Sequence, residues 1–560
     1  MSEKIKITIV MDDEKLNMKN QDEQPDVIIL TQESSMTIMS VLRENRLLSG
    51  SFCGGRGDCG RCVVQFLEGA PLPTGIERSR LEPEELRQGF RLACVTRPKT
   101  DCVIRIPEQD GQEIPIVTEL NSVSENIDSS GRQNKLSGNQ ISFAMKVSEE
   151  AEEDAHNSNK KQRVISKEEA DVMIAVDLGT TTIAMQLRDM VTGEVIDTYC
   201  ELNPQRTYGT DVLSRIQASC DGHREELRRL VCEVLLRGLR QFSARMETMG
   251  GECGGAERCG QLVCMCIAGN TTMEHLLLGY DVSALGRSPF TPVEIGLQEL
   301  TVSVLLGKDW DFPVYIAPGI SAFVGGDIVA GLYTLRMLPG IFSPCQRDER
   351  VEAGKQEPVT LLIDLGTNGE MAIVDGKRML VTATAAGPAF EGGRNGTLIG
   401  TDRIALTAEL LRQETLDETG LLAETKDIND CYLNQRDIRD LQMAKAAIRA
   451  GVEILWEKMG SPEIGMVYLA GGFGYYLDVE AALAIGLLPE RLRGHIRAVG
   501  NTALEGAYRL GRDLAAGVLT KNRLEEVLAV TENGNVDAVN LAKQERFEAL
   551  YLKYMNLERN

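Results

Sequence analysis

Apolar and polar side chains alternate along short segments of the first 108 residues, in a pattern typical of half-buried strands. The predicted strands cover residues 4–10, 26–30, 63–67 and 103–106. Apolar residues at helical spacing predict a helix over 35–46, and an acidic segment after Pro83 predicts a short helix over 83–88. The pattern therefore predicts a small mixed α+β domain over residues 1–108.

The apolar pattern fades over residues 109–171. The stretches 121–135 and 149–167 are rich in Ser, Asn, Glu, Asp and Lys, and they hold few side chains that a core could bury. Such a composition does not offset the entropy that is lost when the backbone becomes ordered. We therefore expect a mostly disordered, flexible linker of acidic and polar residues between two folded parts.

An α/β pattern begins at residue 172 and continues to residue 560. An apolar strand over 172–176 leads into a Gly/Thr turn and a second strand, and the same order returns from residue 359. The two segments match closely, as AVDLGT ending at Thr180 and LIDLGT ending at Thr367. This internal duplication predicts two related subdomains that face each other, over about 172–357 and 358–560.

Composition and charge narrow the classes of function. Apolar residues make up 43% of the 560 positions and charged residues 26%, as in ordinary soluble globular proteins. A formal net charge of −23 would repel nucleic acid and anionic membranes, so we expect neither as a partner. The start shows no signal-peptide pattern, and no apolar run of about 20 residues occurs, which predicts a cytoplasmic protein.

Four of the 14 cysteines have a spacing that indicates a metal centre. Cys53, Cys59 and Cys62 lie in one glycine-rich loop, and Cys94 lies in a later segment. Three thiolates from one loop and a fourth from a distant segment are typical ligands of a [2Fe–2S] cluster. The loop between the first two cysteines is longer by one residue than in plant-type ferredoxins, and its glycines let the backbone bend closely round a cluster.

Other interpretations of these cysteines stay open. A zinc knuckle or a set of free thiols would use the same residue type, although zinc sites usually pair two short Cys-x-x-Cys hooks and here there is one. Cys102 is a possible substitute for Cys94 as the fourth ligand, but its place in a predicted strand favours a core thiol.

The turn after the strand at 172–176 has the residues of a phosphate-binding hairpin. Its glycine lets backbone amides approach a phosphate, its hydroxyls add donors, and its carboxylate can hold Mg²⁺ through water. These candidate residues are Asp177, Gly179, Thr180, Thr181 and Thr182. A Walker-type P-loop is excluded, because the turn lies between two strands and lacks the Gly-Lys-Ser/Thr ending.

Two further glycine-rich segments extend this pattern. The segment DLGTNGE over 364–370 repeats the first turn, and AGGFG over 470–474 follows a predicted strand and would let an adenosine lie against the backbone. The candidate residues of these segments are Asp364, Gly366, Thr367, Asn368, Gly369, Gly471, Gly472 and Gly474. Each turn alone is more often a plain β-hairpin, whereas the three together indicate an ATP site.

In this order and spacing, the three segments resemble the phosphate and adenosine motifs of the actin, sugar-kinase and heat-shock chaperone ATPase superfamily. The resemblance implies a duplicated, ribonuclease-H-like ATPase domain over 172–560. A β-grasp, ferredoxin-like domain fused to such an ATPase is similar to one family, the reductive activators of corrinoid proteins. The segments AGNTTM at 268–273, APG at 317–319 and AGPAFEGG at 386–393 resemble segments of that family.

The family resemblance implies an activity, cofactors and partners. Members use ATP to return an inactive Co(II) corrinoid to Co(I) for methyl transfer, with an electron from a [2Fe–2S] cluster. The resemblance carries cluster ligation onto Cys53, Cys59, Cys62 and Cys94, and contacts to ATP phosphates and Mg²⁺ onto the two DLGT turns. It implies a corrinoid protein and an upstream electron donor as partners, and a homodimer as the assembly.

ATP hydrolysis also needs a group that orients water. Asp327 resembles the position of the sugar kinases' base and is the first candidate, while Glu370 and Glu391 are weaker ones. The alternative role for Asp327 is that of N-cap for a helix over 328–335.

Three other functions compete with corrinoid activation. An ATP-gated donor to another low-potential enzyme, such as a radical dehydratase, would place a [4Fe–4S] cluster at a dimer interface and lack the fused ferredoxin domain. A small-molecule kinase with a redox-sensing domain would transfer phosphate without needing the cluster. A regulatory protein would use ATP only to switch conformation.

Overall fold

The protein is described from a computed structural model. The described residues are 4–10, 27–33, 36–45, 47, 62–106, 171–252, 260–307, 310–342, 358–366, 368–384, 400–423, 426–428, 431–530 and 535–558. The predicted linker lies almost entirely outside them, and the predicted domain boundaries stay predictions.

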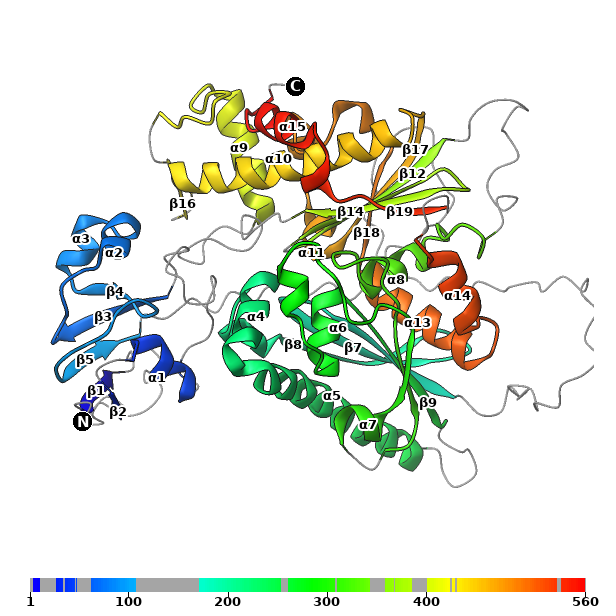
Figure 1. Ribbon diagram of the computed structural model, residues 1–560, viewed down its shortest axis with the longest axis horizontal. Helices are drawn as coiled ribbons and strands as arrows, with labels where there is room; N and C mark the ends of the chain where they lie inside the picture. Colours follow the sequence, from blue (N-terminus) through cyan, green and yellow to red (C-terminus); the bar gives the residue numbers. More distant parts are fainter. Residues whose placement is uncertain are drawn as a thin grey trace, which may run out of the picture.

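Strands of the N-terminal region form one sheet with the order β2-β1-β5-β3-β4 (Figure 1). They are β1 Lys4–Val10, β2 Val27–Glu33, β3 Val63–Glu68, β4 Phe90–Leu92 and β5 Cys102–Arg105. Along β1 the side chains of Ile5, Ile7 and Ile9 are buried while Lys4 and Lys6 are exposed, so the predicted alternation is confirmed. β1 pairs antiparallel with β2 and parallel with β5, which gives the expected β-grasp domain.

Short helices cover this sheet, and three elements of the domain differ from the prediction. The helices are α1 Ile38–Glu44, α2 Gly75–Arg80 and α3 Pro83–Arg87. α1 begins later than predicted, because Thr37 lies outside the helix and its hydroxyl accepts a hydrogen bond of 3.2 Å from the Ser40 N–H. The prediction missed α2 and β4, although Thr74 and Glu77 form a capping box at the start of α2 that the sequence displays.

The first half of the ATPase region is built on a sheet with the order β10-β11-β9-β6-β7-β8. Its strands are β6 Val172–Leu178, β7 Thr182–Asp189, β8 Val195–Leu202, β9 Leu262–Gly269, β10 Gln298–Thr301 and β11 Pro313–Ile316. β6 and β7 form the predicted antiparallel hairpin, and β9 pairs parallel with β6 on the other side.

The second half repeats this arrangement in a sheet with the order β18-β17-β12-β13-β14-β19. Its strands are β12 Val359–Leu365, β13 Gly369–Val374, β14 Met379–Thr384, β17 Ile464–Ala470, β18 Ile496–Gly500 and β19 Val536–Ala538. β12 pairs antiparallel with β13 and parallel with β17, just as β6 pairs with β7 and β9. The expected duplication is therefore confirmed. A separate two-stranded sheet joins β15 Lys426–Ile428 and β16 Cys431–Leu433.

Helices pack against the outer face of each sheet. On the first half these include α4 Val212–Ala218, α5 Arg224–Glu252, α6 Thr271–Leu278 and α7 Val302–Leu306. On the second half they include α9 Gly400–Arg412, α10 Gln435–Lys458, α12 Val479–Ala484 and α15 Phe547–Tyr554. Because the inner face is covered as well, β12 is apolar on both sides: Leu361 and Ile363 face the outer helices, and Leu362 belongs to the inner core.

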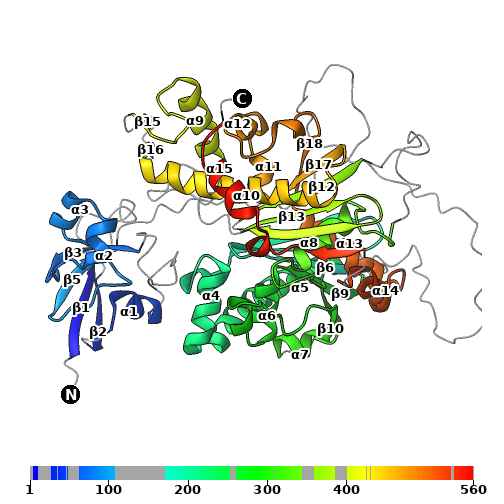
Figure 2. The ribbon, with the colours of Figure 1, turned by 45° about the horizontal axis from the view of Figure 1, so that its top comes forward.

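Two helices fill the layer between the sheets, as Figures 1 and 2 show: α8 Gly326–Thr334 from the first half and α13 Thr502–Ala515 from the second. The two helices pack directly on each other through small residues. A Cβ atom on Gly506 would collide with the backbone of Ala330, and one on Gly331 would lie 2.9 Å from the Thr502 hydroxyl. α13 also packs on the first sheet, since a Cβ on Gly511 would lie 2.6 Å from the Cys266 Cβ. The inner core is thus shared by both halves.

None of the described helices is long and apolar enough to pass through a membrane.

Candidate functional site

The β6–β7 hairpin places the first predicted phosphate turn at the edge of the inner layer. Asp177 is paired with Ala184 in the ladder, one step before the turn that begins at Gly179. A Cβ atom on Gly179 would lie 2.6 Å from the Thr182 carbonyl, so the tightness of this turn requires glycine. The Thr180 hydroxyl accepts a hydrogen bond of 2.9 Å from Asn270 Nδ2, which holds this side chain toward α6.

The β12–β13 hairpin forms the matching turn of the second half. Asp364 pairs with Glu370 across the hairpin, and the Gly366 N–H donates to the Asn368 carbonyl over 2.9 Å. Gly369 is the first residue of β13 and packs beside Ile448. Thr367 lies outside the described residues.

The third glycine-rich segment follows a strand, as predicted, and continues as a helix and not as a hairpin turn. β17 ends at Ala470, and helix α11, Gly471–Tyr476, begins at the next residue and contains the predicted Gly472 and Gly474. Gly471 has a φ of +81°, and a Cβ atom there would meet the Asp364 side chain and lie 2.7 Å from the Leu365 carbonyl. The start of α11 therefore touches the second phosphate turn.

Three aspartates from different elements interact electrostatically in this region. Desolvation raises the pKa of Asp177 to about 6, and a hydrogen bond of 2.8 Å from Asn501 opposes the shift. Desolvation and the charges of Asp327 and Asp177 raise the pKa of Asp364 to about 8. Because like charges act on one another here, the two turns and α8 converge on one site.

Asp327 is the second residue of α8, and its pKa is raised to about 7 by desolvation and by the charge of Asp177. The alternative role as an N-cap is wrong: Gly325 occupies the N-cap position, and the Asp327 carboxylate accepts from the Ile328 N–H over 2.8 Å. Glu370 is buried, and desolvation with the charges of Asp327 and Asp364 raises its pKa well above the usual range. Glu391 lies outside the described residues.

Two residues that hold this site in place were missed from the sequence. Asn270 caps α6 by accepting from the Met273 N–H over 3.0 Å while it donates to Thr180. Glu274 is buried and accepts from the Gly269 N–H over 3.1 Å, close to the start of α8. The segment AGNTTM drew attention to this region, but only the fold shows that its Asn270 contacts the first phosphate turn.

These residues fit a bound Mg²⁺–ATP by their chemistry. Carboxylates that raise one another's pKa favour a divalent cation among them, and glycine turns admit phosphates. Within the described ranges, no group of three or more His, Cys, Asp or Glu side chains is placed to hold a metal ion by itself. A magnesium ion would therefore be held jointly by the ATP phosphates, water and one or two carboxylates, which is its usual mode of binding.

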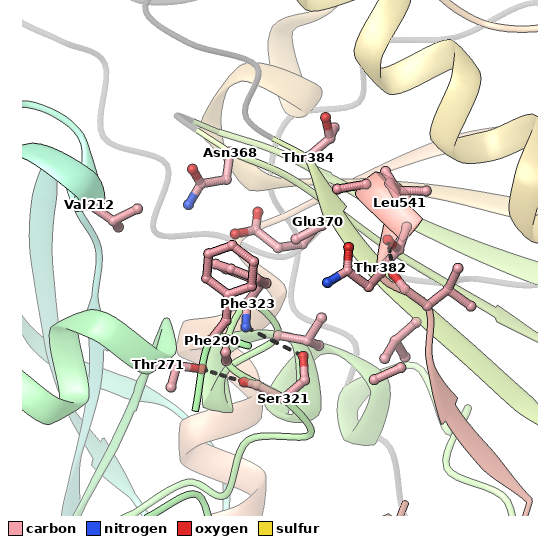
Figure 3. A pocket seen from close by; sticks show the side chains of 18 of the residues that line it. Val212, Thr271, Phe290, Ser321, Phe323, Asn368, Glu370, Thr382, Thr384 and Leu541 are labelled. Atoms are coloured by element: carbon pink, nitrogen blue, oxygen red, sulfur yellow. Dashed lines mark hydrogen bonds between the residues drawn. The ribbon is translucent and has the colours of Figure 1, made fainter. Parts of the chain in front are cut away.

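A cavity of about 660 Å³ opens between the two halves beside this site. Figure 3 shows Phe290 and Phe323 of the first half near Asn368 and Glu370 of the second. The two phenylalanine rings pack edge to face with their centroids 5.0 Å apart. The wall of the cavity is apolar over much of its area, and its polar residues include Asn368 and Glu370 of the second hairpin.

Two of the four predicted cluster cysteines lie side by side in the N-terminal domain. Cys62 directly precedes β3, and Cys94 lies in the turn after β4; both are buried. The Ala93 N–H donates to the Cys62 carbonyl over 2.7 Å, which ties the two segments together. Cys53 and Cys59 lie outside the described residues. The placement of Cys62 and Cys94 fits two ligands from separate segments that share one cluster.

Cys102 has the surroundings of a core thiol. It is buried in β5, and desolvation with the charge of Asp101 raises its pKa to about 11. A raised pKa disfavours the thiolate that a metal ligand requires.

Glu77 supports the turn that carries Cys94. Its side chain is 1% exposed, and its carboxylate accepts hydrogen bonds of 3.0 Å from the Leu92 N–H and 2.7 Å from the Thr96 hydroxyl. The same carboxylate closes the capping box with the Thr74 N–H over 2.7 Å. The capping-box spacing could have indicated the helix start, but not this second role.

Family models match nearly the whole described chain. The models described as "2Fe-2S iron-sulfur cluster binding domain", "RACo middle region" and "C-terminal domain of RACo the ASKHA domain" match residues 20–99, 172–339 and 358–560. ASKHA denotes the ATPase class of actins, sugar kinases and heat-shock chaperones.

Curated relatives agree with these models. The corrinoid activation enzyme RamQ of Eubacterium limosum is 28% identical over 423 residues, which cover 62% of this chain and 66% of RamQ. The match therefore spans slightly less than two thirds of that relative. A Methanosarcina barkeri protein named [Co(II) methylated amine-specific corrinoid protein] reductase is 22% identical over 443 residues, covering 68% of this chain and 76% of that protein.

A solved structure shares the fold. The protein described as "Reductive activator for corrinoid, iron-sulfur protein" aligns with a TM-score of 0.55 and 22% identity, over 99% of this chain and 98% of its own. With the three family matches in their order along the sequence, the chain belongs to the RACo family of reductive activators of corrinoid proteins, which join a 2Fe–2S ferredoxin domain to an ASKHA ATPase domain.

Proposed function

We propose that this chain hydrolyses ATP to drive one electron onto the Co(II) form of a corrinoid protein, which regenerates Co(I) for methyl transfer. The observation that carries the proposal is the union of a 2Fe–2S domain and an ASKHA domain in one chain of this family. Neither domain alone specifies the reaction, because each fold hosts many activities.

The energetics explain why such an electron transfer needs ATP. A plant-type [2Fe–2S] cluster has a reduction potential near about −400 mV. We expect the Co(II)/Co(I) couple of the corrinoid protein to lie lower, and each 100 mV of deficit costs about 2.3 kcal/mol for one electron. Hydrolysis of ATP would offset this deficit. Tight binding of the Co(II) form would reduce the deficit further by changing the ligands of cobalt.

The phosphate groups of ATP would lie between the two hairpin turns. In this proposal the turn at Gly179–Thr182 and the turn at Gly366–Gly369 supply backbone N–H groups and hydroxyls. Asp177 and Asp364 hold Mg²⁺, directly or through water. The adenosine lies near Gly471, Gly472 and Gly474, at the contact between α11 and the second turn.

Asp327 is the proposed base that orients the attacking water. Two observations support this role: its carboxylate interacts electrostatically with Asp177, and its pKa of about 7 suits a group that accepts a proton near neutral pH. Its place in the first turn of α8 favours the ionised carboxylate, which is the form that accepts the proton.

Cys53, Cys59, Cys62 and Cys94 are the proposed ligands of the [2Fe–2S] cluster, which when bound supplies one-electron chemistry. The corrinoid protein is the proposed acceptor, and an upstream donor would refill the cluster. The homodimer and the cytoplasmic setting remain predictions, as does the absence of nucleic-acid and membrane partners.

A small-molecule kinase is a second candidate function. The cavity of about 660 Å³ between the halves supports a kinase function, since that volume would admit a small substrate beside Glu370. This candidate predicts phosphoryl transfer to an added acceptor with the cluster dispensable. The candidate of a donor to another low-potential enzyme predicts ATP-dependent reduction of a different acceptor.

Reduction of a purified Co(II) corrinoid protein, followed anaerobically by its visible spectrum, separates these candidates. With a reductant present, Co(I) is expected only when ATP is added, and Cys59→Ala is expected to abolish it. ATP consumption with cobalt remaining as Co(II) across several corrinoid proteins would favour the kinase or the other electron donor. Asp327→Asn is expected to keep ATP binding and lose turnover.

A further inference from the structure

Three consecutive carbonyl groups of the first phosphate turn are bound from one side of the hairpin. Asn203 Nδ2 donates to the Gly179 carbonyl over 2.9 Å, and the Asn203 backbone N–H donates to the Thr181 carbonyl over 2.9 Å. Between them, the guanidinium of Arg215 donates to the Thr180 carbonyl. Asn203 directly follows β8, and Arg215 lies within α4.

The planar trans peptide turns these contacts into a constraint on the N–H groups. In such a peptide the carbonyl of one residue and the N–H of the next point in opposite directions. The carbonyls of residues 179–181 are directed at Asn203 and Arg215. The N–H groups of residues 180–182 are therefore directed away from these two residues. Successive N–H groups that point the same way form a concave anion-binding surface.

Arg215 is itself held rigidly. Its side chain is completely buried, and its guanidinium also donates to the Gly209 carbonyl over 2.9 Å and to Gln205 Oε1 over 3.1 Å. Gln205 is buried too, and its own amide donates to the Leu227 carbonyl over 2.9 Å. A buried guanidinium with several fixed acceptors keeps one orientation, and its positive charge behind the turn favours an anion in front of it.

We infer that Asn203 and Arg215 are positioning residues of the ATPase: by holding the carbonyls of the 179–182 turn, they aim its N–H groups at the phosphates of ATP. This inference rests on the proposed function, in which that turn binds ATP. Neither residue touches the nucleotide. Both act through the peptide groups of the turn, so their loss weakens contacts to phosphate and leaves those to adenosine intact.

A role limited to folding makes a different prediction, and Arg228 provides the matched control. This arginine lies in the same half and also donates to backbone carbonyls, to Leu277 over 3.0 Å and to Leu305 over 2.9 Å. Those carbonyls are not part of a phosphate turn. If Arg215 only stabilises the fold, Arg215→Met and Arg228→Met will affect nucleotide binding alike.

The test measures the affinity of the full-length protein for ATP and for adenosine, with Mg²⁺ present, by titration calorimetry. Arg215→Met is expected to weaken ATP binding by about tenfold to a hundredfold, the range for loss of one hydrogen bond from a charged donor. Adenosine binding is expected to stay unchanged, and Arg228→Met to leave both affinities unchanged. Arg215→Lys keeps one donor and is expected to recover part of the ATP affinity.

A second variant keeps the test decisive if Arg215→Met fails to fold. The Asn203 side chain also caps the 3₁₀ helix Pro204–Thr207 by accepting from the Gln205 N–H over 3.0 Å. Asn203→Ser keeps a capping oxygen and removes the donor to Gly179. It is expected to lower the affinity for ATP and not that for adenosine.

Three outcomes would contradict the inference. Equal affinity of wild type and both Arg215→Met and Asn203→Ser for ATP would overturn it while leaving the proposed function intact. Parallel loss of ATP and adenosine binding would assign these residues to the fold alone. Wild-type protein that binds neither ATP nor adenosine would overturn the proposed function, and this inference with it.

Discussion

Asn501, at the start of α13, donates a hydrogen bond of 2.8 Å from Nδ2 to Oδ2 of Asp177, at the end of β6. The two residues belong to opposite halves of the ATPase region. The same Asn501 side chain caps α13 by accepting from the Leu504 N–H over 2.8 Å. A residue at the start of a helix of the second half therefore holds a carboxylate of the first half and partly offsets the effect of burial on its pKa.

Replacing Asn501 should change the pH dependence of ATP hydrolysis. Asn501→Ser keeps a capping group for α13 and removes the donor to Asp177, so the pKa of Asp177 should rise further above about 6. Because Mg²⁺ needs the ionised carboxylate, the acid limb of the pH–rate profile should move up by about half a unit to one unit. An unchanged profile would show that Asp177 is not the group that titrates there.

Neutralising Asp364 should stabilise the nucleotide-free protein at alkaline pH. Its carboxyl has a pKa of about 8 in the folded chain, against an ordinary value of 3.8, so the folded state binds more protons between these values. The stability contributed by protonated Asp364 is present at low pH and is lost as the pH rises toward 8. Asp364→Asn should therefore raise the melting temperature at pH near 8 while ATP hydrolysis is lost.

The exposed Asp537, on β19, provides the control for Asp364. Asp537→Asn should leave the melting temperature at pH near 8 unchanged. A melting curve of Asp364→Asn that depends on pH as steeply as that of wild type would contradict the assignment of this carboxyl.

Replacing the Glu77 carboxylate should weaken the binding of the iron–sulfur cluster by the Cys94 turn. Glu77→Gln keeps the size of the side chain, but its NH₂ group would face N–H or O–H groups that now donate to the carboxylate. The lost hydrogen bond should reduce the stability of the domain by about 1–3 kcal/mol. Because Leu92 and Thr96 flank the turn of Cys94, we expect lower iron content and a bleached visible spectrum.

Glu85 allows a direct comparison with Glu77. It closes an analogous capping box by accepting from the Glu82 N–H over 2.7 Å, at a partly exposed position. Glu85→Gln should retain its iron. Equal iron loss in the two variants would mean that the helix starts, and not the contact to the Cys94 turn, explain the effect.

Two cysteine variants should distinguish a ligand of the cluster from a thiol of the hydrophobic core. Cys94→Ala should lose the [2Fe–2S] spectrum, whereas Cys102→Ala should keep it and lose only packing, since its thiol is buried and its pKa is raised to about 11. Iron and sulfide analysis with electron paramagnetic resonance of the reduced protein checks both. A cluster that survives Cys94→Ala but not Cys102→Ala would reverse the assignment.

Much of the fold could be predicted from local pattern. The alternation in β1 and the repeated DLGT turns are properties of neighbouring residues, and they led to the β-grasp domain and to the duplicated ATPase sheets. The β4 strand was missed because three residues give too short a pattern. α11 was not predicted, because three of its six residues are glycines, which are poor helix formers.

The candidate site was predicted only where its residues sit in motifs. Asn203, Arg215 and Asn501 lie far from the phosphate turns along the sequence, and only the folded chain brings their side chains to Gly179, Thr180 and Asp177. An isolated asparagine or arginine carries no signal of that kind, because most such residues lie on the surface. Asp327 was found by its resemblance, and its alternative role failed because Gly325 takes the capping position.

The position of α13 also determines when the first half can finish folding. This helix covers the inner face of β6 and β9 and packs on α8, yet it is translated after both complete sheets except for β19. Until residues 502–515 have left the ribosome, the part of the inner face of β6 and β9 that α13 covers stays exposed. We therefore expect the nascent first half to bind chaperones, and expression of the first half without α13 should give an insoluble product.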